Sequence, residues 1–541
     1  EISCSLVGSE MCIRDRDKIQ VPGEPAMQGY AIEHDKPFTY RKSFTVPADY
    51  AGKHTILRFD GVYSHARLFV NGTFVREHHG GFTRWDTDVT PFVRPGKKNE
   101  IRLEVTDRLD DISYASGYAH HPIGGILRDV TLFALPETCL YDFYAETHLD
   151  AAYEDAVLKI GYSSPVVGGA EVAYTLADPS GRRYPLAQSR FPLKEGGNMN
   201  ELPVKNPLKW DAEHPNLYTL TVTLSKDGKE IGRFDRRIGF RDVKIEKDRM
   251  LVNGMPVKLR GACRHDIHPT LGRTTTAELD SLDVILFKRS NMNFVRTSHY
   301  PPTERFLEYC DRYGIYVVDE ANVESHGMGY GDNTLAKAPA YAQAHMERNR
   351  RMVLRDKNHP SVIIWSMGNE AGMGPNFEAC YRWIKEYDPS RPVHYERAVY
   401  DQDGAFTDII CPMYWGYEQC EKYARNNPSK PLIQCEYAHA MGNSMGGLDH
   451  YWELVRKYPS YQGGFIWDFV DQGLVRYEPD GRVSFLYGGD FNDYDATDNS
   501  FNCNGIIAPD RTWHPHAYEV QRQYQSIWTT PVDLAQGRVE V

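Results

Sequence analysis

The chain has 541 residues, which at roughly 100–200 residues per domain corresponds to three or four domains. Its net charge of −12 argues against a nucleic-acid partner, because a surface that binds phosphates needs a basic excess. No run of 18 apolar residues could span a membrane, and the ten cysteines form no CxxC or CxxH pattern typical of a zinc site or a disulfide scaffold.

The two ends of the sequence do not read as parts of a complete fold. The opening EISCSLVGSEMCIRDR lacks the pattern of a signal peptide and reads poorly as a strand, so we expect it to be foreign to the fold. Residues 528–541 read as the start of a further, truncated β domain. We therefore expect a fragment, and its compartment stays open between the cytoplasm and the periplasm of a bacterium.

Two regions of short alternating strands precede the centre of the chain. Residues 17–137 contain runs such as YRKSFTV and ARLFVNGTFV, separated by turns such as Asn71-Gly72, and this pattern predicts a jelly-roll β-sandwich. Residues 138–245 show the same short alternating runs separated by turns, including the hairpin signal Lys226-Asp227-Gly228-Lys229. This region is predicted to form a second, immunoglobulin-like β-sandwich.

The pattern changes between residues 246 and 527, where short apolar runs alternate with helical stretches. Eight runs with intervening helices over about 250 residues predict a (β/α)8 TIM barrel. A doubly wound open sheet is the alternative, but no GxGxxG motif follows a first strand. The predicted runs are residues 256–262, 293–298, 316–321, 361–366, 392–396, 408–414, 431–437 and 463–469.

Polar and aromatic residues follow these predicted strands, and in a TIM barrel the carboxyl ends of the strands carry the active site. Carboxylates, imidazoles and aromatic rings should therefore converge on one rim. The candidates in chain order are His265, Arg296, His299, Asp319, Glu320, Glu324, His326, Asn369, Glu370, Tyr414, Glu436, His439 and Trp467. Two carboxylates on such a rim suit glycosidic cleavage, in which one protonates the leaving oxygen and the other attacks the anomeric carbon or activates water. Spacing along the chain leaves retention and inversion both open.

Several long segments resemble glycoside hydrolase family 2, and in particular its large bacterial β-galactosidases. DKNHPSVIIWSMGNE (356–370) is similar to the acid/base signature of that family and QCEYAHAMGNSMGG (434–447) to its nucleophile segment. NFVRTSHYPP (293–302), YGIYVVDEANVESHGM (313–328) and GGFIWDFVDQGL (463–474) match as well. The resemblance covers residues 20–541 and implies the same order of two β-sandwiches and a catalytic barrel.

The resemblance assigns roles to individual residues. Glu370 would be the acid/base and Glu436 the nucleophile of a retaining mechanism that passes through a covalent glycosyl-enzyme. Asn369 would bind the sugar 2-hydroxyl, Arg296 would orient the nucleophile and Tyr414 would donate a hydrogen bond to it. The remaining substrate contacts would come from His265, His299, His439 and the stacking platform Trp467. Asp319 and Glu320 are expected to be supporting rather than catalytic residues.

The resemblance also implies two cation sites. Mg²⁺ would be held by Glu324, His326 and Glu370; the two carboxylates suit a hard cation, whereas a histidine ligand is less typical of it. Na⁺ would be held by the carbonyl of Phe501 and the side chain of Asn504.

Some positions depart from the β-galactosidase pattern. Cys263 stands where asparagine is usual, and a sodium- and sugar-binding aspartate is missing near Ala119. The resemblance still implies an exo-β-galactosidase acting on terminal β-D-galactose of an oligosaccharide or β-galactoside, with a homo-oligomer left open for the full-length protein. β-Glucuronidase, β-mannosidase, α-L-arabinopyranosidase and a non-catalytic carbohydrate-binding protein are the alternatives.

Overall fold

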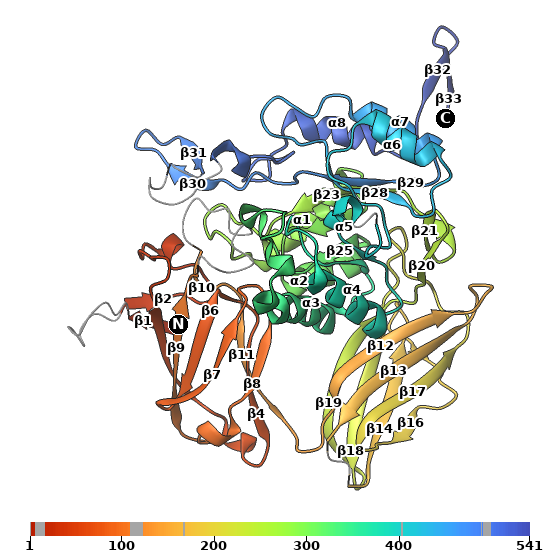
Figure 1. Cartoon of the computed structure of the whole chain (residues 1–541). Helices are drawn as coiled ribbons and strands as arrows, with labels where there is room; N and C mark the ends of the chain where they lie inside the picture. The colour runs from red at the N-terminus through yellow and green to blue at the C-terminus, as the bar shows by residue number, and fades with distance from the viewer. Residues whose placement is uncertain are drawn as a thin grey trace.

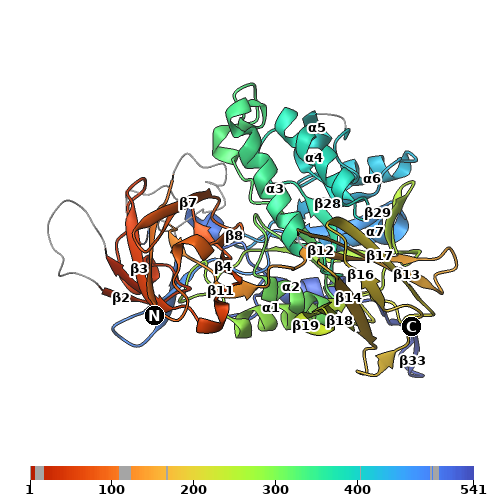
Figure 2. The same ribbon diagram turned by 90° about the horizontal axis from the view of Figure 1, so that it is seen from below.

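A computed structural model describes residues 2–5, 17–108, 123–165, 168–401, 404–487, 490 and 499–541. Figure 1 shows two β modules, drawn in orange and yellow, beside a barrel whose strands and helices run from green to blue. Seen from below, the two modules again lie on opposite sides of the barrel helix α3 (Ala342–Asp356), as Figure 2 shows. Within the part of the chain that the structure describes, none of the helices has both the length and the apolar composition needed to cross a bilayer.

The N-terminal module is a sandwich of antiparallel strands around its own core. Alternation places Phe38, Leu68 and Leu103 in this core, where Phe59 stacks on Trp85 with ring centroids 4.3 Å apart. One sheet has the order β2 (Asp17–Ile19), β1 (Ile2–Ser5), β3 (Phe38–Thr45), β9 (Lys98–Thr106), β6 (His65–Val70) and β7 (Thr73–His79). The others are β11 (Val130–Leu135), β4 (His54–Phe59) and β8 (Trp85–Asp88), and β10 (Gly125–Ile126) with β5 (Val62–Tyr63).

The start of the chain differs from the sequence-based expectation. Residues Ile2–Ser5, which we did not expect to form a strand, pair antiparallel with both β2 and β3. Main-chain hydrogen bonds to neighbouring strands do not require an alternating side-chain pattern, and this is why the pattern gave no signal.

The second module is also a sandwich, and its core is separate from that of the first. Its buried residues run from Ala156 to Phe240, whereas those of the first module run from Ile19 to Ile126. One sheet contains β12 (Tyr141–Leu149), β13 (Ala156–Ser164) and β17 (Gly196–Val204). The other contains β15 (Arg183–Tyr184), β14 (Ala170–Ala177), β18 (Tyr218–Lys226) and β19 (Lys229–Ile238), with β16 (Arg190–Pro192) paired to β14. A domain boundary at 137/138 remains our proposal and is compatible with these two cores.

The barrel sheet is parallel and has the order β27-β26-β25-β24-β23-β29-β28. The strands are β23 (Leu259–Arg264), β24 (Phe294–Thr297), β25 (Tyr316–Glu320), β26 (Val362–Ser366), β27 (Val393–His394), β28 (Leu432–Tyr437) and β29 (Tyr461–Ile466). The helices are α1 (Ala277–Arg289), α2 (Glu304–Tyr313), α3, α4 (Pro375–Tyr387), α5 (Glu396–Asp401), α6 (Tyr417–Arg425), α7 (Leu448–Lys457) and α8 (Pro515–Gln523). A three-stranded antiparallel sheet of β20 (Val243–Glu246), β21 (Arg249–Val252) and β22 (Met255–Pro256) contributes Met250 and Val252 to the core inside the barrel.

The predicted sixth strand, residues 408–414, is not a continuous strand in the structure. It contributes only isolated bridges from Ile410 to Leu432 and from Met413 to Glu436. Pro412 has no N–H for a ladder, and Tyr414 has φ = 53°, which no regular strand contains. The segment nevertheless fills the gap between β27 and β28, because the Asp408 N–H donates to the Val393 carbonyl.

Further hairpins follow the last barrel strand. They are β30 (Leu474–Tyr477) with β31 (Val483–Leu486), and β32 (Thr530–Asp533) with β33 (Arg538–Glu540). The last of them extends away from the barrel in Figure 1, and Val532 and Val539 are exposed on it.

A buried ion pair beneath the barrel makes stability depend on pH. His359 Nδ1 lies 2.6 Å from Asp311 Oδ2. Burial alone would lower the pKa of His359, but Asp311 outweighs it and raises the pKa to about 9 from 6.5. Because the folded state binds this proton more tightly, the stabilisation is complete below pH 6.5 and is lost as the pH rises through 9.

We therefore expect His359→Asn to lower the free energy of unfolding by about 3 kcal/mol near pH 6 and much less above pH 9. The midpoint of thermal unfolding, measured between pH 6 and pH 10 for both proteins, checks this. Equal midpoint shifts across that range would contradict the assigned charge on His359.

Candidate active site

The two predicted catalytic glutamates lie at the carboxyl ends of two different barrel strands, β26 and β28. Glu436 is in β28, one residue before its end, and Glu370 follows β26 by four residues. Both are contacted by side chains from other segments of the barrel. Glu436 is 5% exposed, whereas the Glu370 side chain is 29% exposed. Glu436 is therefore a buried carboxylate with fixed partners, and Glu370 is open to the solvent side of the rim.

Glu436 is held by one cation and one phenol. Arg296 Nη1 donates to Oε1 at 2.9 Å, and the Tyr414 hydroxyl donates to Oε2 at 2.7 Å. Burial raises the pKa of Glu436, Arg296 opposes the rise, and the nearby Glu370 adds to it. Both oxygens are thus fixed in a dry environment, the arrangement that a positioned nucleophile needs.

Arg296 connects the two glutamates through a network of buried polar groups. Its Nη2 donates to Asn369 Oδ1 at 2.6 Å, and Asn369 immediately precedes Glu370. Its Nε and Nη2 donate to the two oxygens of Glu320 at 2.7 and 3.1 Å. Burial would raise the pKa of Glu320, but Arg296 and His299 outweigh it and lower the pKa to about 2. Glu320 is therefore a permanent anion that fixes Arg296, in line with the supporting role expected for it.

Two histidines and a tryptophan form one wall of the rim. His299 stacks on Trp467 with centroids 5.0 Å apart and planes at 10°, and its Nδ1 lies 2.8 Å from Glu320. His265 meets Trp467 edge to face at 5.6 Å. Burial and the neighbouring Arg273 lower the pKa of His265, so this ring is neutral. Rigid aromatic faces beside neutral hydrogen-bonding groups suit an uncharged sugar.

The remaining predicted residues at the rim, His439 and Tyr414, are more exposed. The His439 ring lies 5.9 Å from Tyr414 and 5.7 Å from Phe501. Burial lowers the pKa of His439. The structure therefore brings the predicted substrate residues His265, Arg296, His299, Asn369, Tyr414, His439 and Trp467 to one rim with the two glutamates.

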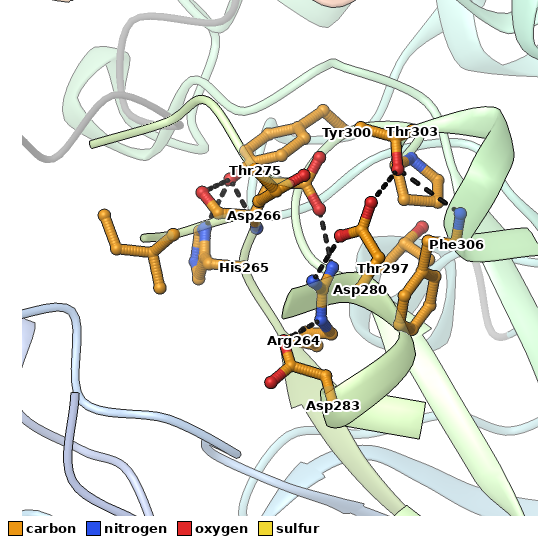
Figure 3. A network of polar contacts seen from close by, with 12 residues as sticks. Arg264, His265, Asp266, Thr275, Asp280, Asp283, Thr297, Tyr300, Thr303 and Phe306 are labelled. Atoms are coloured by element: carbon orange, nitrogen blue, oxygen red, sulfur yellow. Dashed lines mark hydrogen bonds and ion pairs between the residues drawn. The ribbon is translucent and has the colours of Figure 1, made fainter. Parts of the chain in front are cut away.

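The wall is supported by a buried ionic network, shown in Figure 3. Arg264 at the end of β23 donates to Asp266 at 2.6 Å, to Asp280 at 3.1 Å and to Asp283 at 2.9 Å. The Tyr300 hydroxyl accepts from the Asp266 N–H and lies 3.1 Å from His265 Nδ1. This network fixes the backbone from which His265 reaches the rim.

The three residues expected to bind magnesium form a cluster. Single ligand atoms of Glu324, His326 and Glu370 lie within 4.8 Å of one another. Glu324 accepts hydrogen bonds from the Asn369 amide and the His326 N–H. Burial and repulsion from Glu370 raise the pKa of Glu324. A divalent cation would relieve this repulsion between two carboxylates, so the residues present fit such a group.

The two residues expected to bind sodium also lie together. The Asn504 side-chain amide donates to the Phe501 carbonyl. Asn504 Oδ1 is buried and makes no hydrogen bond with any residue that the structure describes. If the amide were flipped, Oδ1 would lie beside the Phe501 carbonyl, and a cation could then bind both oxygens. Ala119, near which the sequence departs from the family, lies outside the described residues.

Two further residues at the rim were not assigned any role from the sequence. Glu396, at the start of α5, accepts a hydrogen bond from the Glu370 main-chain N–H at 2.9 Å. Tyr330, in the segment after β25, donates to Glu370 Oε1 at 2.9 Å. Glu396 ends the predicted fifth strand run, which could have drawn attention to it. Tyr330 carries no signal in the sequence, because its contact depends on how its loop folds back.

Comparison with known proteins assigns the chain to a family. The description "Glycosyl hydrolases family 2, TIM barrel domain" matches residues 243–529. The chain belongs to glycoside hydrolase family 2. The sugar binding domain of that family matches residues 10–136, and a further description, "Glycosyl hydrolases family 2", matches residues 138–241. The predicted fold class, two β-sandwiches and a TIM barrel, is therefore confirmed.

Curated relatives include the β-galactosidase of Aeromonas hydrophila, 42% identical over 523 residues, which covers 93% of this chain and 50% of the relative. The β-galactosidase of Vibrio vulnificus is 39% identical over 555 residues, covering 93% and 52%. The chain thus spans about half the length of the curated relatives it matches.

Solved structures with the same fold include two β-glucuronidases. That of Bacteroides uniformis gives a TM-score of 0.78 at 23% identity, covering 98% of this chain and 69% of the other. That of Ruminococcus gnavus, in complex with D-glucuronic acid, gives 0.79 at 21% identity, covering 97% and 96%. At these identities the likeness concerns the fold alone.

Proposed function

We propose that this chain is the catalytic part of a retaining exo-β-galactosidase that releases terminal non-reducing β-D-galactose by double displacement. The observation that carries the proposal is the pair of glutamates on one rim, one buried and fixed, the other open to solvent. The choice of galactose is supported by the curated relatives, which are β-galactosidases at about 40% identity. The fold neighbours do not favour glucuronic acid, because their identity is too low to carry specificity.

In the proposed first step, a Glu436 oxygen attacks the anomeric carbon while Glu370 gives a proton to the glycosidic oxygen, whose bond to that carbon breaks. In the second step Glu370 takes a proton from water, the water oxygen attacks the anomeric carbon, and the bond to Glu436 breaks. Arg296 holds Glu436 Oε1 throughout, and the Tyr414 hydroxyl donates a hydrogen bond to Glu436 Oε2. Two inversions at one carbon give net retention.

The substrate would lie against the wall formed by Trp467, His299 and His265, with Asn369 and His439 bonding hydroxyls. We further propose that Glu324, His326 and Glu370 hold Mg²⁺, and that Phe501 and Asn504 hold Na⁺. A bound divalent cation would offset the negative charge that Glu324 places beside the acid/base. The same pair of carboxylates would serve a β-glucuronidase, a β-mannosidase or an α-L-arabinopyranosidase, so it does not by itself select the sugar.

A panel of nitrophenyl glycosides of these sugars, assayed with the full-length protein, tests the proposal. We expect the β-D-galactoside to give the highest kcat/KM. Preference for another sugar would overturn the specificity, and absence of turnover on every glycoside would leave a carbohydrate-binding protein instead. EDTA in the same assay is expected to lower kcat/KM, with recovery on added MgCl2; unchanged turnover would contradict the magnesium site.

A further inference from the structure

The carboxylate of Glu370, the proposed acid/base, keeps one orientation only if neighbouring groups hold it. Glu370 has φ = 41°, in the left-handed region that residues with a side chain rarely adopt. Its side chain is 29% exposed, and its Oε2 lies 3.6 Å from His326 Nδ1, beyond a normal hydrogen bond. Strained backbone at a functional site persists only where the surroundings fix it.

Tyr330 supplies a hydrogen bond to this carboxylate. Its hydroxyl donates to Glu370 Oε1 at 2.9 Å from a half-buried ring. Hydrogen bonds to a charged acceptor are about twice as strong as those between neutral groups. Oε1 is therefore fixed, and the carboxylate cannot rotate without breaking this bond.

The Tyr330 ring is itself held by two neighbouring side chains. The Arg397 guanidinium lies 4.2 Å from the ring centroid, and the His326 ring lies parallel to it at 5.6 Å and 2°. A cation over an aromatic face is an attractive contact. Arg397 is in turn held by Asp401 at 3.1 Å, one turn further along α5. The phenol therefore has little freedom to leave the carboxylate.

The same short helix also holds the main chain of Glu370. Glu396, the residue before Arg397, is 2% exposed, and its Oε1 accepts the Glu370 N–H at 2.9 Å. Two consecutive residues of α5 thus fix Glu370 by different routes. Glu396 acts on the backbone, and Arg397 acts on the carboxylate through Tyr330.

We propose that Tyr330 is a positioning residue for the acid/base: it holds Glu370 Oε1, and Arg397 of α5 holds Tyr330 in place. The inference rests on the proposed function, because it takes Glu370 to be the proton donor. Tyr330 touches neither the scissile bond nor the nucleophile in this account. Its contribution should therefore appear only in steps that require a proton from Glu370.

Leaving-group dependence isolates that contribution. An alkyl or phenyl galactoside leaves as a strong base and needs the proton, whereas a 2,4-dinitrophenyl galactoside leaves as a stable anion and does not. In Tyr330→Phe we expect kcat/KM for the first class to fall about tenfold to hundredfold, part of the effect of a general acid. For the dinitrophenyl galactoside we expect a change of about threefold or less, because attack by Glu436 is untouched.

The matched control is Tyr458→Phe. Tyr458, after α7, also donates from a half-buried phenol to a carboxylate, Glu421, at 2.8 Å. This variant should leave kcat/KM for both classes of galactoside unchanged. An equal loss on both substrates in Tyr330→Phe, or no loss on either, would overturn the proposal. So would recovery with excess MgCl2, because the effect would then belong to the cation site.

The two proposals fail in different ways. If the unaltered protein cleaves no β-galactoside, the proposed function fails. If it cleaves both substrate classes but Tyr330→Phe shows no leaving-group dependence, only the positioning role fails. Thermal unfolding of the variant, which should match that of the unaltered protein, excludes a general loss of structure.

Discussion

Glu436→Gln is expected to lower kcat by about 10⁴-fold or more while the fold is retained. An amide is a poor nucleophile, and no other carboxylate can take over the attack from the same position. The geometry supports this choice, because Arg296 and Tyr414 fix one oxygen each of Glu436. Steady-state kinetics on the best nitrophenyl glycoside measures the loss.

A fluorinated galactoside with an activated leaving group provides the direct readout. It should add one sugar mass to the unaltered protein, and the label should map to the peptide that carries Glu436. The matched control is Glu421→Gln in α6. It replaces a carboxylate that lies away from the rim, where its Oε1 is 2.8 Å from Lys457 Nζ, and it should keep full activity. A Glu436→Gln protein that kept most of its activity, or a label on another peptide, would remove Glu436 from the nucleophile role.

The second large effect concerns Glu370. In Glu370→Ala we expect kcat/KM for galactosides with poor leaving groups to fall about 10²–10⁴-fold, the usual contribution of a general acid. With an activated leaving group, the first step should survive and the second, which needs a base, should limit turnover. Azide needs no base, so it should restore turnover and yield a galactosyl azide.

The configuration of that azide decides the stereochemistry. A β product, identified by nuclear magnetic resonance, is expected for two successive inversions at the anomeric carbon, with Glu436 as the nucleophile of the first displacement and the leaving group of the second. An α product would indicate direct displacement and an inverting enzyme, and no response to azide would argue against Glu370 as the acid/base. Glu378→Gln in α4, which removes a half-buried carboxylate paired with Arg382, is a suitable control.

Much of the rim could be predicted because the relevant residues follow strands directly. Parallel strands in a closed barrel end at one face, so Arg296, Asn369, Glu370 and Glu436 had to meet there once the strands were recognised. The main error in the barrel was the sixth strand. Its apolar composition is that of a buried strand, but Pro412 and the left-handed Tyr414 interrupt the hydrogen bonds between strands. The periodicity of apolar residues contains no information about either feature.

The sequence by itself therefore determined the barrel, the two sandwiches before it, and which residues reach the catalytic rim, because strand patterns and strand ends are local properties. Only the tertiary structure decided what holds those residues. Glu320 reaches Arg296 and His299 from the neighbouring strand β25, Glu396 holds the Glu370 N–H from the start of α5, and Tyr330 reaches Glu370 from a loop. Such contacts join segments 21 to 40 positions apart and depend on side-chain direction and loop path, which no local pattern specifies.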